Sequence, residues 1–155
     1  MPNWCNNRVT ISAGNEQEEK QLAEIKAIFQ KDNPFQVIYP MPDFDKIPHP
    51  DTGELPVAEE IKNQAGEVVH ISTRWKDGTQ DCRWYDWRTS HWDTKWDINE
   101  KDVEWSDEED DYIEFSFDTA WAPPEGVCRE LRNKYPDLSI TWFYDEPGME
   151  FAGYL

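Results

Sequence analysis

The densest group of ionisable side chains lies between Asp97 and Asp118. This stretch holds eleven Asp and Glu residues and one base, Lys101, so it carries more than half of the chain's net charge of −18. Carboxylates at this density could imitate the phosphates of a nucleic acid and occupy the basic groove of a nucleic-acid-handling protein, with an affinity that falls as salt rises. A solvated strand edge that resists aggregation would carry the same charges, so both interpretations stay open. The candidate partner-binding residues are Glu104, Asp107, Glu108, Glu109, Asp110, Asp111 and Glu114.

A second group combines Trp with Arg between residues 84 and 96. A helix here would carry two stripes of rings, Trp84 with Trp87 and His91, and Tyr85 with Trp92 and Trp96. Arg interleaved with Trp could stack the bases of a single nucleic-acid strand or hold a small aromatic ligand. Core packing with surface ion pairs explains the same residues and is the alternative. The candidate ligand-binding residues are Trp84, Trp87, Arg88, His91, Trp92 and Trp96.

Metal and catalytic patterns are weaker. The acidic run 107–111 lacks the spacing and the glycine of a calcium loop. Asp86, His91 and Lys95 could form an acid–base cluster, but no nucleophile or phosphate-binding loop accompanies them. The His and Cys residues show neither paired His spacing nor a CxxC pair: His49, His70, His91, Cys5, Cys82 and Cys128. We therefore expect a non-enzymatic protein with no catalytic residues, metal or cofactor, whose folding needs no disulfide.

The overall charge limits the kinds of molecule that the chain can bind. The chain has 15 Lys and Arg against 33 Asp and Glu, so nucleic acid and anionic membranes would be repelled by the chain as a whole. A basic protein is the better candidate, and simple solubility is the other explanation of the charge. No apolar run approaches the roughly 20 residues of a membrane-spanning helix, and residues 1–4 do not begin a signal peptide, so we expect a cytoplasmic protein of unspecified oligomeric state.

The N-terminal half predicts a strand and a helix before a less regular region. Alternating residues predict a strand over 4–12, and a helix is expected over 15–31, where Asn15 and Glu18 form a capping-box pattern. A short strand at 35–39 follows. The pattern of the next region is ambiguous, with a helical turn and then an extended segment within 59–80, and helix possible over 82–92.

The C-terminal half predicts two hairpins around a helix. Residues 103–105 and 112–121 read as the first hairpin, and Ile113, Phe115, Phe117 and Thr119 share one face of it. A helix over 123–135, with Cys128 on its buried face, and a hairpin of 138–144 with 149–155 complete the chain. This order predicts one ferredoxin-like α+β domain over residues 1–155, an antiparallel sheet with two main helices on one face. The expected helix residues in contact with the sheet are Leu22, Ile25, Phe29, Val127 and Leu131, packed on Val9, Ile11, Phe115 and Ile140.

Four motifs together resemble a known family. They are Met1-Pro2-Asn3-Trp4-Cys5-Asn6-Asn7, the pair Trp84-Tyr85-Asp86-Trp87 and His91-Trp92-Asp93-Thr94-Lys95-Trp96-Asp97, Phe117-Asp118-Thr119-Ala120-Trp121-Ala122-Pro123-Pro124, and Glu146-Pro147-Gly148-Met149-Glu150-Phe151-Ala152-Gly153. In these motifs the chain resembles the Api92-like/YubB family of small phage- and plasmid-borne proteins. The resemblance implies a ferredoxin-like fold and a mobile-element origin, and it brings no catalytic residue. The family pattern has Gly where Asp93 stands, so a different backbone is expected there.

Overall fold

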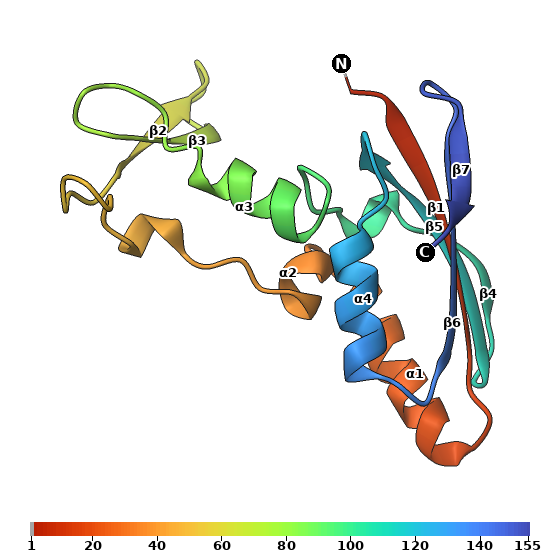
Figure 1. The fold of residues 1–155 in the computed structure, drawn as a ribbon. Helices are drawn as coiled ribbons and strands as arrows, with labels where there is room; N and C mark the ends of the chain where they lie inside the picture. Colours follow the sequence, from red (N-terminus) through yellow and green to blue (C-terminus); the bar gives the residue numbers. More distant parts are fainter. Residues whose placement is uncertain (1) are drawn as a thin grey trace. The chain divides into compact units, whose positions relative to one another are not determined.

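A five-stranded antiparallel sheet organises the computed structural model, which describes residues 2–155 and the side chains of all of these except residues 69–72. The strands are β1 (Trp4–Ser12), β4 (Glu104–Glu108), β5 (Tyr112–Ala120), β6 (Ser139–Glu146) and β7 (Phe151–Tyr154). Their order in the sheet is β4-β5-β1-β6-β7, and all neighbours are antiparallel (Figure 1).

Two helices complete the predicted ferredoxin-like fold. Helix α1 (Glu16–Phe29) follows β1, and helix α4 (Glu125–Lys134) joins β5 to β6. Without the insertions, the chain runs β1-α1-β4-β5-α4-β6, which is two split βαβ units, and β7 extends the sheet. Figure 1 shows both helices on the same side of the sheet. The predicted fold class is confirmed.

The core lies between the sheet and this helix layer. Alternation in β1 and β5 buries Val9, Ile11 and Phe115, while the intervening residues face away from the helices. The ring of Phe29 lies 4.6 Å from that of Phe115, which is one of the predicted contacts. All of the side chains that we expected at this boundary are buried: Val9, Ile11, Leu22, Ile25, Phe29, Phe115, Val127, Leu131 and Ile140.

Helix α1 begins as its sequence predicts. The Asn15 side chain accepts a hydrogen bond of 2.9 Å from the Glu18 N–H, and the Glu18 carboxylate accepts one from the Gly14 N–H. The two acceptors satisfy backbone donors that the first turn of a helix leaves without partners.

The predicted strand at 35–39 is wrong, because these residues form helix α2 (Pro34–Ile38). Asn33 adopts φ 60°, and Pro34 occupies the first turn, where a missing N–H costs nothing. The carboxylate of Asp97 accepts hydrogen bonds from the N–H groups of Phe35 (3.0 Å) and Gln36 (2.9 Å). Because Asp97 is distant from α2 in the sequence, the residues around 34–38 give no indication of this helix cap.

Residues 41–87 form a second compact unit, separate from the unit of residues 1–40 and 88–155 that contains the sheet. It contains a hairpin of β2 (Val57–Lys62) and β3 (Val68–Arg74), so the helical turn expected in 59–80 is wrong. Arg83 organises this unit: it pairs with the buried Asp81 at 3.0 Å and donates to the Phe44 carbonyl at 2.8 Å. One domain over residues 1–155 stays a prediction.

Candidate functional site

The acidic hairpin of β4 and β5 does not present its carboxylates on one face as expected. Glu104 pairs with Ser116, and Asp107 with Glu114, on the face of the sheet without helices. A register shift between Trp105 and Asp107 then places Glu108 opposite Ile113, whose side chain is in the core. Because cross-strand partners share a face, this β-bulge sends Glu108 toward the helix layer and divides the acidic residues.

The turn of the hairpin, residues 109–111, holds three consecutive exposed acids on a fixed backbone. The Glu109 N–H donates to the Tyr112 carbonyl at 2.8 Å, and the Ala13 N–H donates to the Asp111 carbonyl at 2.8 Å. The second bond ties the turn to the segment between β1 and α1. The backbone that carries the three carboxylates is therefore fixed at both ends of the turn.

Few bases neutralise this charge. Lys26 of α1 lies 3.3 Å from Glu108, and Arg8 of β1 lies 4.0 Å from Glu114. Within the described part of the chain, no basic nitrogen lies within 4.0 Å of the other five carboxylates, those of Glu104, Asp107, Glu109, Asp110 and Asp111. Most of the negative charge of the hairpin is thus left to solvent.

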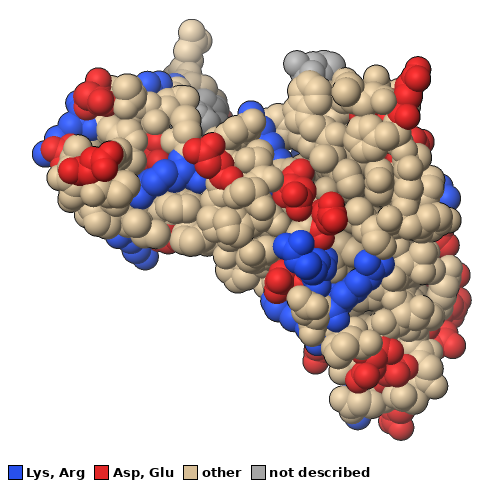
Figure 2. Space-filling model, in the orientation of Figure 1, with Lys and Arg blue, Asp and Glu red and all other residues tan. Residues whose placement is uncertain are grey.

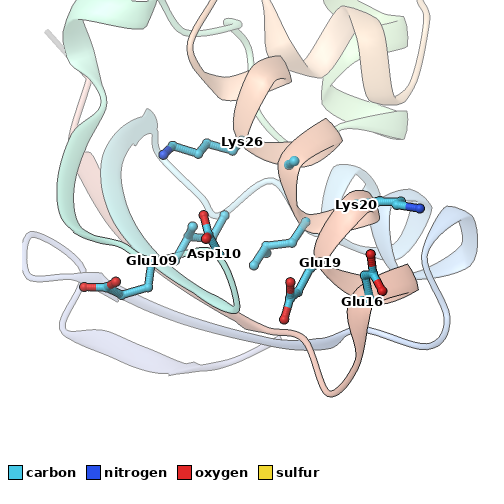
Figure 3. Close-up of a pocket in the computed structure, with 9 residues that line it drawn as sticks. Glu16, Glu19, Lys20, Lys26, Glu109 and Asp110 are labelled. Atoms are coloured by element: carbon cyan, nitrogen blue, oxygen red, sulfur yellow. The ribbon is translucent and has the colours of Figure 1, made fainter.

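The turn also faces acids of α1 across a pocket of about 370 Å³. Figure 3 shows Glu109 and Asp110 on the hairpin side of the pocket and Glu16 and Glu19 on the helix side, with the Glu109 carboxylate directed away from the helix. Lys20 and Lys26 line the pocket as well, and its apolar lining is Leu22, Ala23 and Ile113. We call Glu16, Glu19, Glu109, Asp110 and Asp111 the acidic end.

Sequence reasoning missed the helix half of the acidic end. Acidic residues are favourable in the first turn of any helix because of the helix dipole, so those of α1 do not by themselves indicate a binding site. No local sequence feature connects them with residues 109–111. The joining signal is tertiary: β1 pairs with β5 so that Ser12 lies opposite Tyr112, which brings the start of α1 beside the hairpin turn.

Other basic side chains of the same unit gather near α4. Figure 2 shows Lys and Arg atoms near α4 and acidic atoms where α1 begins. Two basic residues of α4 stabilise the fold through hydrogen bonds. Arg132 donates to the Ile140 carbonyl at 3.0 Å, and Lys134 donates to the Ile38 carbonyl at 2.6 Å.

The Trp-rich segment is helical only in its first part, as α3 (Arg83–His91). Asp93 takes φ 68°, the left-handed region, and its N–H donates to the Arg88 carbonyl at 3.1 Å, which ends the helix as a glycine would. The predicted second stripe of Tyr85, Trp92 and Trp96 is therefore wrong, because Trp92 and Trp96 lie beyond the helix. Asp is among the residues that tolerate the left-handed conformation. Glycine, the residue at this position in the family pattern, adopts it readily as well.

The candidate ligand-binding residues of this segment have different environments. Trp92 is fully buried, and its indole N–H donates to the Tyr39 carbonyl at 2.8 Å, so it belongs to the core. Trp96 is exposed. Trp84 and Trp87 are half-buried within the unit of residues 41–87, whereas Arg88, His91, Trp92 and Trp96 belong to the unit with the sheet. Ligand binding by the six as one set stays a prediction.

Asp97 and Arg88 are used inside the fold. Burial raises the pKa of Asp97, against the opposing effect of N–H donors from Phe35, Ile98 and Gln36 and of the Arg88 charge. Burial also lowers the pKa of Arg88, whose guanidinium lies 4.9 Å from the Trp92 ring. A carboxylate that caps α2 is not available as part of a binding surface.

No catalytic arrangement emerges among the described residues. The His91 ring nitrogen lies 2.9 Å from the Ser90 hydroxyl, and Asp86 belongs to the other unit. The described side chains include no group of three or more His, Cys, Asp and Glu arranged to hold a metal; His70 lies outside them. Cys5, Cys82 and Cys128 are free thiols, and burial raises the pKa of Cys5 and of Cys128 to about 11.

Two of the sequence motifs, residues 1–7 and 117–124, meet in one buried network. The Asn7 amide donates to the Thr119 hydroxyl at 2.9 Å and accepts from the Trp142 indole N–H at 3.0 Å. Thr119 in turn donates to the Ala122 carbonyl at 2.7 Å. Within the last motif, residues 146–153, the carboxylate of the buried Glu146 accepts from the N–H groups of Gly148 and Met149. These motif residues hold the fold together.

None of the helices, over the residues described, is both long enough and apolar enough to cross a membrane.

Comparisons with known proteins agree with this architecture. A crystal structure of the protein Api92 from Yersinia pseudotuberculosis superimposes with a TM-score of 0.54 over 99% of this chain and 93% of that one, at 13% identity, which is a likeness of fold. No curated protein matches the sequence. The family model described as the ferredoxin-like domain in Api92-like protein matches residues 91–155, which span β4, β5, α4, β6 and β7. Residues 91–155 are therefore similar to the ferredoxin-like domain of Api92-like protein, and this match covers less than half of the chain.

Proposed function

We propose that this chain is a non-enzymatic, acidic binding protein of a phage or plasmid, which engages a basic, nucleic-acid-handling protein in the cytoplasm. The observation that carries the proposal is the hairpin turn, where the three exposed carboxylates of residues 109–111 have no basic partner within 4.0 Å among the described residues. In its sharpest form the protein imitates a nucleic-acid backbone and blocks a defence factor of the host.

The geometry of the acidic end suits a basic partner for two reasons. Among the described residues no ion pair uses the carboxylates of the acidic end, so their charge remains available to steer and hold a basic groove. Its backbone is fixed by hydrogen bonds at Glu109 and Asp111, so little conformational entropy is lost when the partner binds. Lys20 and Lys26 beside the carboxylates add a mixed pattern of charge, which would fix the register of the partner.

The alternative function, binding of single-stranded nucleic acid or a small aromatic ligand through residues 84–96, has less support. Trp92 is in the core, and the net charge of −18 repels nucleic acid.

The test neutralises the turn. In the variant Glu109→Gln/Asp110→Asn/Asp111→Asn, we expect the fold to persist, because these side chains are exposed, and the capture of a basic protein from host lysate to be lost. Capture by the unaltered chain should weaken strongly between about 50 mM and about 300 mM salt, because binding displaces counterions.

The matched control removes the same charge from the other unit. Asp51→Asn/Glu59→Gln/Glu60→Gln changes three exposed acids of residues 41–87 and should capture the same protein as the unaltered chain. Equal capture by the turn variant and the control variant would reject the acidic end as the binding site.

A further inference from the structure

A second pocket, of about 550 Å³, opens at the other end of the acidic hairpin. It lies within the unit that contains the sheet, between the start of β1, the loop before β4 and the end of β5. Its walls combine two indole rings with charged side chains, one of which is the Asp97 that caps α2: Trp4, Trp96, Asp97, Lys101, Asp102, Glu104 and Asp118.

The two rings are the unusual part of this pocket. Trp4 is 48% exposed and Trp96 39%, and their ring centroids lie 6.2 Å apart with an angle of 36° between the planes. Trp rings are among the side chains that gain most from burial, and a contiguous exposed pair marks a surface that a ligand covers. The core does not use these faces, in contrast to Trp92 and Trp142, which are fully buried.

The carboxylates around the rings differ in their hydrogen-bond and ion-pair partners. Asp118 accepts a hydrogen bond of 3.0 Å from the Asn6 amide. Asp102 and Glu104 have no basic nitrogen within 4.0 Å in the part of the chain that the structure describes. Even with Lys101 counted, negative charge therefore predominates beside the aromatic faces.

One cation already lies against these rings. The Lys95 ammonium lies 4.7 Å from the centre of the Trp96 ring, within the range of a cation–π interaction. Lys95 itself does not line the pocket. Aromatic faces flanked by carboxylates are the surroundings that an organic cation prefers.

We propose that this pocket binds an arginine side chain, presented by the basic partner. The planar guanidinium stacks on an indole face, is more weakly hydrated than an ammonium, and can bind a carboxylate such as Glu104 through two hydrogen bonds. The identity of the donor as a protein rests on the proposed function, whereas the preference of the pocket for guanidinium rests on the rings and carboxylates alone.

The test uses the whole chain and a single amino-acid derivative, N-acetyl-arginine methylamide, with no partner present. We expect saturable binding with a Kd of about 1–10 mM, followed by the shifts of the Trp4 and Trp96 indole N–H signals in two-dimensional NMR. The neutral citrulline derivative has nearly the same shape and should bind at least about tenfold more weakly, because both the cation–π and the carboxylate contacts need the charge.

Variants assign the binding to the pocket. Trp96→Leu and Glu104→Gln should each weaken the arginine derivative by about tenfold, whereas Tyr154→Leu, which removes an exposed ring outside the pocket, should have no effect. Absence of binding, equal binding of citrulline, or an equal loss in Tyr154→Leu would each overturn the proposal. Such a result would leave the acidic end to its own test, because that test measures capture of a protein by residues 109–111.

Discussion

The Asn7 side chain shows how a single polar residue joins three strands. It lies on β1, donates to Thr119 on β5 and accepts from the indole of Trp142 on β6, and it is fully buried. A buried amide is tolerated only when its donors and acceptors have partners, and here each partner is itself buried. Its neighbour Asn6 faces the opposite side of the sheet, where its amide donates to Asp118 at an exposed site.

We expect Asn7→Ala to lower the free energy of unfolding by about 2–4 kcal/mol, measured by urea denaturation. The substitution leaves the Trp142 indole N–H buried without an acceptor and leaves a small cavity. The matched variant Asn6→Ala removes an exposed hydrogen bond from the same strand and should cost less than about 1 kcal/mol. Similar losses in both variants would contradict a special role for the buried network.

At the scale of the elements, local patterns were sufficient for β1, β5 and α1, each of which packs one face on the core. Alternation in β1 and β5 and the Asn15 cap of α1 follow directly from the sequence, and the structure agrees. Helix α2 was not predictable in this way, because the Asp97 carboxylate that caps it is distant in the sequence. The short apolar run in α2 is compatible with a strand or a helix, and the tertiary contact decides between them.

The candidate sites were predictable to different degrees. The charge of residues 107–111 is visible in the sequence, but the bulge in β4 that divides the carboxylates is not. Glu16 and Glu19 join the turn only through strand pairing, and Trp4 meets Trp96 only through the fold. Composition therefore indicated which residue types matter, whereas the geometry of each site depends on contacts between distant segments.

Helix α4 begins against the end of α3, and Gly126 makes this approach possible. A Cβ atom at Gly126 would lie 1.6 Å from the His91 carbonyl oxygen, and the Gly126 N–H donates to the Asp93 carboxylate at 2.9 Å. Replacing glycine by alanine inside a helix normally stabilises it by about 1 kcal/mol. Here the sign should reverse, because a backbone oxygen occupies the space that the new methyl group would need.

We expect Gly126→Ala to lower the free energy of unfolding by at least about 2 kcal/mol, because the end of α3 and the start of α4 must move apart. Denaturant unfolding monitored by circular dichroism measures the loss. Asn133→Ala, at an exposed position of the same helix, should instead raise stability by about 0.5 kcal/mol, as helix propensity predicts. A stabilising Gly126→Ala would show that the two helices separate without cost.

Over the whole molecule, negative charge is far in excess of what ion pairs neutralise. The net charge is −18, and ion pairs such as Lys26–Glu108 and Arg8–Glu114 lie at largely exposed positions, where a pair contributes about 0–1 kcal/mol. Such an excess keeps a protein soluble and destabilises its folded state through self-repulsion. We therefore expect the acidic end to lower the stability of the folded state, and a binding function would explain why these charges are present.

The last prediction measures that cost. At about 10 mM salt, the variant Glu109→Gln/Asp110→Asn/Asp111→Asn should be more stable than the unaltered chain by about 0.5–1 kcal/mol, because it relieves repulsion among carboxylates that have no basic partner within 4.0 Å in the described residues. The difference should shrink at about 300 mM salt, because salt screens the repulsion between solvent-exposed charges. Lys26→Met is the opposite control, since it removes the partner of Glu108 and should destabilise the protein at low salt. Thermal unfolding at both salt concentrations compares each of the two variants with the unaltered chain. If the turn variant loses stability at low salt, its carboxylates hold the fold together, and the charge of the acidic end then needs no partner to explain it.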